Sequence, residues 1–432
     1  MLFCKPIVGG DNEIREKTCQ VKVGNDGISL TLRRYNYSFL TNMKHLVYTF
    51  FCLALFLCSL SLNAQNKEKV QKRENYEFYK NMPVYAEKLI ADLDYPLAWG
   101  NSKIKNFRKW KKVAREKVFE CMLTPPPPAK GGYQMKVLAE EQRDGYKAQK
   151  IEIQLSEYYP VRALLLIPNG EGPFPAVNAL HDHGAHLFIG KEKMIRPFSE
   201  SAEVVEDADA WAANLYDGQY VGDYLAKNGY VVFSADAPMW GERGRAEGVS
   251  RTHYDMIAGN MMMYGVDLSA YMTYDDISGT EFLATLPCVD AERIGCMGCS
   301  MGAYRAWMLS ALSDRIKVGA AVCWMVTSDV QLTTKYGRSE NGGFANCIPG
   351  LRRWLDYPHI ASLACPKPML FINGKQDKLF PVPGVEKAFG VMHEVWKSQG
   401  AEDKLDTELW DIPHSCGLEA QKKVLEFFKK NL

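Results

Sequence analysis

The chain has 432 residues, of which 47% are hydrophobic and 24% charged. This is the composition of an ordinary globular protein, and it excludes disordered, collagen-like and coiled-coil chains. Lysine and arginine number 52 against 51 aspartate and glutamate, and the resulting net charge of +1 argues against a nucleic-acid partner. The length predicts one large domain, with or without a small one, and a small molecule, a neutral polymer or a protein as its partner.

A stretch that begins at Met43 is typical of a secretory signal peptide. A short polar region at 44–45 precedes an apolar run over 46–62, and the small residue Ala64 comes just before a strongly polar segment. We therefore expect cleavage near Ala64, export to the periplasm or the medium, and no stable membrane insertion afterwards. The alternative is a transmembrane anchor, for which the apolar run lies at the lower limit of length.

Signal peptides begin near an initiator methionine, and residues 1–42 show no convincing periodic pattern. We interpret 1–42 as an upstream extension and Met43 as the true start. Residues 43–64 are then the signal peptide, 65–130 an N-terminal helical extension and 131–432 the main domain. The eight cysteines after residue 64 are scattered, and their spacing predicts no disulfide pairing.

The first part of the expected mature chain is helical and the next part β-like. Apolar residues recur at helical spacing within 75–122, and a run of four prolines at 125–128 ends that region. Over 133–167 apolar and polar residues alternate, which predicts antiparallel edge strands.

Short apolar runs then alternate with helical stretches, which is typical of parallel βαβ units. We expect an α/β fold with a doubly wound, mostly parallel sheet. Segment 237–276 has no clear period and is expected to drape over one end of that sheet. The predicted strands are 174–180, 230–234, 293–297, 318–324, 368–372 and 407–410, and the predicted helices are 208–227, 277–286, 302–313, 383–398 and 417–430.

The strongest local motif is Gly-Cys-Ser-Met-Gly at 298–302, between a predicted buried strand and a predicted helix. This strand–turn–helix context is that of a nucleophile elbow, in which the glycines allow a sharp turn and the serine is exposed at its tip. A position at a helix N-terminus also favours developing negative charge. Ser300 is the predicted nucleophile, and the alternative is a structural serine in a glycine-rich turn.

A serine nucleophile needs a base that a third group orients, in the chain order acid and then histidine. Asp377 follows the predicted strand 368–372, and His414 follows the strand at 407–410. Taken singly, they could be a turn-capping carboxylate and a surface histidine. In this order, each after a strand, they complete a predicted triad of Ser300, Asp377 and His414.

The segment His181-Asp182-His183-Gly184-Ala185-His186 directly follows the first parallel strand. In this architecture such a loop gives a backbone N–H to the oxyanion hole, so we assign the amides of Ala185 and Met301 to that role. His183 and Trp240 are the predicted substrate-pocket residues. The alternative is a metal site built from His181, His183 and His186.

The motifs resemble the α/β-hydrolase superfamily over roughly the last 280 residues. Three segments, 181–186, 236–244 and 298–302, are similar to secreted bacterial acetyl xylan esterase-like and dienelactone-hydrolase-like proteins. The resemblance implies an α/β-hydrolase catalytic domain over 131–432. It also implies a serine ester hydrolase that needs neither metal nor other cofactor.

The resemblance further implies a small ester or an acylated plant cell-wall polysaccharide such as xylan as substrate. A serine peptidase of the prolyl-oligopeptidase type would share the triad, but it usually carries a large N-terminal β-propeller. A metallohydrolase and a non-catalytic carbohydrate-binding protein are further alternatives. The sequence indicates neither the acyl group nor the oligomeric state.

Overall fold

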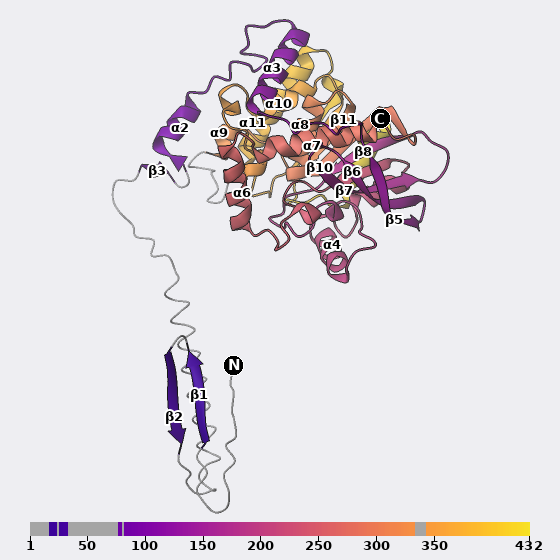
Figure 1. The fold of residues 1–432 in the computed structure, drawn as a ribbon. Coiled ribbons are helices and arrows are strands. Elements are labelled where there is room, and N and C mark those ends of the chain that lie inside the picture. Colours follow the sequence, from indigo (N-terminus) through magenta and orange to yellow (C-terminus); the bar gives the residue numbers. More distant parts are fainter. Residues whose placement is uncertain (1–16, 24–25, 33–76, 80–81, 333–342) are drawn as a thin grey trace, which may run out of the picture. The chain divides into compact units, whose positions relative to one another are not determined.

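The computed structural model describes two separate units of the chain, Met1–Tyr76 and Glu77–Leu432. In the first unit, strands β1 (Lys17–Val23) and β2 (Asp26–Leu32) pair antiparallel, in a region where the sequence showed no period. The predicted signal peptide, 43–64, lies outside the described residues. The structure describes the whole chain except residues 1–16, 24–25, 33–76, 80–81 and 333–342 (Figure 1).

The second unit is built on a nine-stranded sheet in the order β13-β12-β11-β10-β8-β9-β7-β6-β5. The strands from β13 to β9 run parallel, whereas β7, β6 and β5 continue the sheet as antiparallel neighbours. This confirms the mostly parallel sheet. The strands are β5 (Met135–Arg143), β6 (Tyr146–Gln154), β7 (Pro160–Pro168), β8 (Phe174–Leu180), β9 (Val231–Ala235), β10 (Val289–Cys299), β11 (Ile316–Val322), β12 (Met369–Gly374) and β13 (Leu405–Trp410).

Helices cover both faces of this sheet because alternate side chains of each strand point to opposite faces. Leu370 and Ile372 of β12 pack in one core with α5 and α12, whereas Met369 and Phe371 pack in another with α3, α8 and α11. The helices are α2 (Val84–Ala91), α3 (Phe107–Cys121), α4 (Ala202–Leu215), α5 (Val221–Lys227), α6 (Arg251–Met263), α7 (Leu268–Leu283), α8 (Met301–Leu312), α9 (Ser328–Gln331), α10 (Tyr357–Ala361), α11 (Val382–Ser398) and α12 (Leu418–Asn431). The described part of this unit also contains a two-stranded ladder, β3 (Phe78–Tyr79) with β4 (Met82–Pro83). It further contains six 3₁₀ turns, including η1 (Lys191–Lys193) and η3 (Phe344–Asn346).

Three predicted elements differ from the structure. Segment 237–276 contains most of two helices, α6 and α7; α7 is buried around most of its circumference, so its sequence has no amphipathic period. The predicted helix 208–227 is broken where Asp217 and Gly218 adopt positive φ. Region 75–122 holds α2 and α3 with a non-helical link, and the side chain of Asn106 caps α3 by accepting from the Lys109 amide.

The strand order reverses at β8, because β9 lies on one side of it and β10 on the other. In open α/β sheets, ligand sites form beyond the carboxyl ends of strands at such a switch point. The loop after β8 and the turn after β10 are therefore neighbours at this edge. Among the described helices, none is long and apolar enough to cross a membrane.

Candidate active site

Ser300 lies at a sharp turn between β10 and α8, in the left-handed region with φ 56° and ψ −124°. A non-glycine residue held there is strained, and such strain is concentrated at functional sites. The flanking glycines explain the turn. A Cβ on Gly298 would lie 2.3 Å from the Gly302 carbonyl, and a Cβ on Gly302 would lie 1.9 Å from the Leu180 oxygen. Only glycine permits this close approach of strand and helix.

The structure brings Asp377 and His414 into contact. Asp377 Oδ2 lies 2.6 Å from His414 Nδ1, and Asp377 Oδ1 accepts from the Leu379 amide at 2.8 Å. Burial alone would lower the pKa of His414, but the hydrogen bond and charge of Asp377 outweigh it and raise that pKa above the ordinary value. With Nδ1 bonded to the carboxylate, Nε2 is left as the proton acceptor.

Ser300 and His414 line the same cavity, which has a volume of about 1060 Å³. Within the described part of the chain, to which both residues belong, the Ser300 hydroxyl and the His414 imidazole form no hydrogen bond. Catalytic hydrogen bonds of this kind often tighten only when substrate binds. The rest of the lining includes aromatic and polar side chains, among them Trp211, Arg251, Asp255, Trp324, Gln331, Phe344, Asn346 and Phe380.

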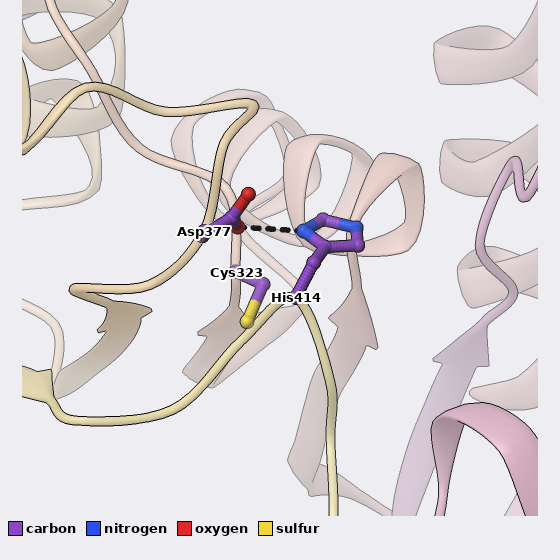
Figure 2. A group of neighbouring side chains, drawn as sticks. All are labelled: Cys323, Asp377 and His414. Atoms are coloured by element: carbon purple, nitrogen blue, oxygen red, sulfur yellow. Dashed lines mark hydrogen bonds and ion pairs between the residues drawn. The ribbon is translucent and has the colours of Figure 1, made fainter.

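A cysteine that the sequence analysis did not single out lies beside the pair. Figure 2 shows Cys323 next to Asp377 and His414, and ligand atoms of the three residues lie within 4.8 Å of one another. The Cys323 thiol donates to the Ser415 carbonyl at 3.3 Å, and a hydrogen bond with Cys299 lowers the pKa of Cys323. Sulfur, oxygen and nitrogen ligands suit zinc. However, the imidazole and carboxylate atoms already bond to each other here.

The three histidines considered as metal ligands do not converge. His181 is fully buried; its Nε2 accepts from the Ala237 amide and its Nδ1 bonds to the Asp182 carbonyl. His186 instead pairs with Asp207 at 2.5 Å. Because both ring nitrogens of His181 are occupied, the geometry argues against the alternative metal site in this loop.

Lys193, on η1 (Lys191–Lys193), binds loop 181–186 through hydrogen bonds to its backbone carbonyls. Its side chain is fully buried, and its ammonium donates to the carbonyls of Asp182, His183 and His186 at 3.3, 3.2 and 2.9 Å. It also pairs with the Asp182 carboxylate at 3.4 Å. Burial lowers the pKa of Lys193. Trp211 and Tyr216 donate to the same carboxylate, so loop 181–186 is fixed by one buried polar frame.

Two of the predicted site residues, Ala185 and Trp240, have contacts that the sequence did not indicate. The Ala185 amide donates to His183 Nδ1 at 2.9 Å, so it serves an oxyanion only after that bond is released. Trp240 does not line the described cavity; it is fully buried behind His183, with ring centroids 4.9 Å apart and its indole N–H on the His183 carbonyl. His183 lines the cavity. Met301 opens α8, and first-turn amides have no partner inside their helix.

A second group of potential metal ligands is occupied by an ammonium. Glu192, Asp236 and Glu242 lie close enough to share an ion, but Lys191 Nζ is 2.6, 2.9 and 2.8 Å from their carboxylates. Sequence reasoning missed both buried lysines, because a charged Lys-Glu-Lys run reads as a solvated turn. Lys191 is buried against Asp236 and Glu242, which are distant in the chain, and Lys193 against carbonyls of the preceding loop, so no local pattern indicates their burial.

The comparisons with known proteins agree with this architecture. Residues 86–397 match the model of the Abhydrolase family. YtaP of Bacillus subtilis (strain 168), provisionally named a hydrolase, is 31% identical over 271 residues, which are 62% of this chain and 83% of YtaP.

Two solved structures share the fold at low sequence identity. A Bacteroides fragilis NCTC 9343 protein, provisionally named an acetyl xylan esterase, superposes with a TM-score of 0.61 at 19% identity, covering 80% of this chain and 84% of its own. A glucuronoyl esterase from Solibacter usitatus superposes with a TM-score of 0.56 at 15% identity, covering 78% and 97%. The family match, the sheet order and the strained serine together place this chain in the Abhydrolase family, with an α/β-hydrolase fold.

Proposed function

We propose that the protein is an exported serine carboxylic ester hydrolase that removes acetyl or other short acyl groups from plant cell-wall polysaccharide such as xylan. One observation carries the reaction type: a strained serine and a histidine that is hydrogen-bonded to the buried Asp377 line the same cavity at the switch point of the sheet. This combination is what nucleophilic attack on an ester carbonyl requires.

The reaction has two stages. Ser300 Oγ forms a bond to the ester carbonyl carbon as its proton passes to His414 Nε2, and Asp377 stabilises the imidazolium. The tetrahedral intermediate collapses, the bond to the alcohol oxygen breaks, and His414 gives its proton to the departing alcohol. A water that His414 deprotonates then attacks the acyl-enzyme, and the carboxylic acid leaves as Ser300 recovers its proton.

The oxyanion is stabilised by backbone amides at the start of α8 and in loop 181–186. The Met301 amide and the positive end of the α8 dipole lie next to the nucleophile. A second amide comes from loop 181–186, either that of Ala185 after release from His183 or that of a neighbouring residue. Loss of one such donor typically lowers kcat by about 10²–10³-fold.

The polysaccharide substrate is supported by the size of the cavity and by the motif resemblance. The cavity, at about 1060 Å³, is much larger than an acetyl group needs. Two of the fold neighbours are named for carbohydrate esters, the acetyl xylan esterase and the glucuronoyl esterase. Export rests on the sequence of residues 43–64, and N-terminal sequencing of the secreted protein tests it; an unprocessed Met43 would contradict it.

Activity measurements on the protein and on Ser300→Ala test this proposal. Both are assayed on aryl acetate, butyrate and octanoate and on acetylated xylan, with and without a metal chelator. We expect Ser300→Ala to lose at least about 10⁴-fold in kcat and the chelator to change nothing. Acetate release from xylan supports the polysaccharide substrate. Wild-type rates in Ser300→Ala, or abolition by the chelator, would contradict the proposal.

A further inference from the structure

Two charged residues on α6 lie in the wall of the cavity that holds Ser300. Arg251 and Asp255 are one helical turn apart, and Arg251 Nε donates to Asp255 Oδ2 at 3.2 Å. Their side chains are 47% and 44% exposed, so they remain accessible. The proposed acyl transfer leaves both residues without a role.

The helix turn that carries the pair is fixed relative to the catalytic residues. Tyr254, between the two in sequence, is fully buried, and its ring lies 5.2 Å from that of His183. Its hydroxyl accepts from the Ala345 amide at 2.9 Å, and its ring packs under the Arg251 guanidinium at 5.3 Å. A ligand held by the pair is therefore held at a defined position relative to loop 181–186.

The pair still has free hydrogen-bonding capacity. The carboxylate oxygen Asp255 Oδ1 is buried and has no partner among the described residues, so it accepts from a ligand hydroxyl once the carboxylate turns toward the cavity. Of the five guanidinium N–H groups of Arg251, only that of Nε is engaged with a described residue. An acceptor and several donors side by side match adjacent sugar hydroxyls, each of which can both donate and accept.

The charge of the described lining favours a neutral sugar. Arg251 is neutralised by Asp255, and the third charged group, the Asp182 carboxylate, is paired with Lys193. The described part of the wall therefore offers a uronate carboxylate no lysine or arginine whose charge is uncompensated. The indole of Trp211, held by its hydrogen bond to Asp182, adds an apolar face to the same cavity.

We propose that Arg251 and Asp255 form a hydroxyl-binding subsite for a neutral sugar whose acyl ester lies at Ser300. This inference rests on the proposed function and adds the chemistry of the alcohol. The sugar donates one hydroxyl to Asp255 and accepts from Arg251 through another. The two residues thus select a carbohydrate ester over an ester whose alcohol lacks hydroxyls.

The test compares two matched substrates on the full-length protein. One is a monoacetylated methyl xyloside with its other hydroxyls free, and the other is the same compound with those hydroxyls methylated. Hydrogen bonds to charged groups predict a ratio of kcat/KM between them of about 10–100 in the wild type. In Asp255→Asn and in Arg251→Gln we expect the ratio to fall at least about fivefold, mainly through KM.

Two controls keep the test decisive. Glu116→Gln removes an exposed pair of the same i,i+4 spacing, with Lys112 on α3, and should leave the ratio unchanged. Thermal unfolding identifies a variant that fails to fold, in which case the other one carries the test. A ratio that does not change in a folded variant, or a preference for a glucuronoyl ester, would overturn the subsite. Absence of wild-type activity on aryl acetate would instead overturn the proposed function.

Discussion

Replacing Lys193 with methionine tests whether the buried frame beneath loop 181–186 positions that loop for catalysis. The substitution keeps most of the side-chain volume but removes the ammonium that three carbonyls and the Asp182 carboxylate share. Removing one partner of a buried ion pair typically costs about 3–5 kcal/mol. Because Trp211 and Tyr216 still donate to Asp182, we expect a loss of about 2–4 kcal/mol of unfolding free energy.

The effect on catalysis should exceed this loss of stability. A displacement of about 1 Å in a catalytic loop can cost about 10²-fold in rate, so we expect kcat on aryl acetate to fall about 10–100-fold with a smaller change in KM. Assays are run well below the melting transition, where the variant remains folded.

Lys367→Met is the matched control. Lys367 Nζ donates to the carbonyls of Ser310 and Ser313 at the end of α8, and burial lowers its pKa to about 7. Its loss should lower stability while kcat stays the same. Wild-type kcat in Lys193→Met, or equal losses of kcat in both variants, would refute the positioning role.

Three further predictions concern the same site. His414 must be neutral to accept a proton, and its pKa is raised above the ordinary value. We therefore expect kcat/KM to fall as the pH drops through a midpoint above about 6.5. A midpoint below about 6 in a pH–rate profile would contradict this. Gly302→Ala would place a Cβ 1.9 Å from a β8 carbonyl oxygen, so we expect little soluble protein or a large drop in Tm and lost activity; wild-type Tm and activity would show that the turn tolerates a side chain. Trp240→Phe removes the hydrogen bond to the His183 carbonyl, and kcat should fall a few-fold with aryl acetate; a change in KM alone would instead indicate that the indole contacts substrate.

The sequence predicted the site best where the chemistry depends on local backbone geometry. The elbow at Ser300 was predictable because Gly298 and Gly302 are required by contacts within a few residues and with the adjacent strand. Asp377 and His414 were predictable because the order of parallel strands brings the segments that follow them to one edge. The order of the motifs along the chain therefore indicated that these three segments meet at one edge of the sheet, and the triad itself stays a prediction.

Features set by the conformation of a loop or by side-chain packing in the folded chain were not predictable. Trp240 lies behind His183 and not in the cavity wall, because Tyr254 of α6 packs against it. No local pattern in the sequence predicted a helix at α6. The Ala185 amide is occupied because loop 181–186 folds back onto its own histidine. Lys193 resembles a solvated residue in sequence, and its burial depends on acceptors on a loop that packs against it only in the folded chain.

The most direct measurement of the central claim is covalent labelling with a fluorophosphonate, which reacts with activated serine nucleophiles. Peptide mass spectrometry should find one adduct, on the peptide that contains Ser300, formed in step with loss of esterase activity. The Ser300→Ala variant should remain unlabelled and inactive. A label on another residue, or esterase activity that survives complete labelling of Ser300, would contradict the account.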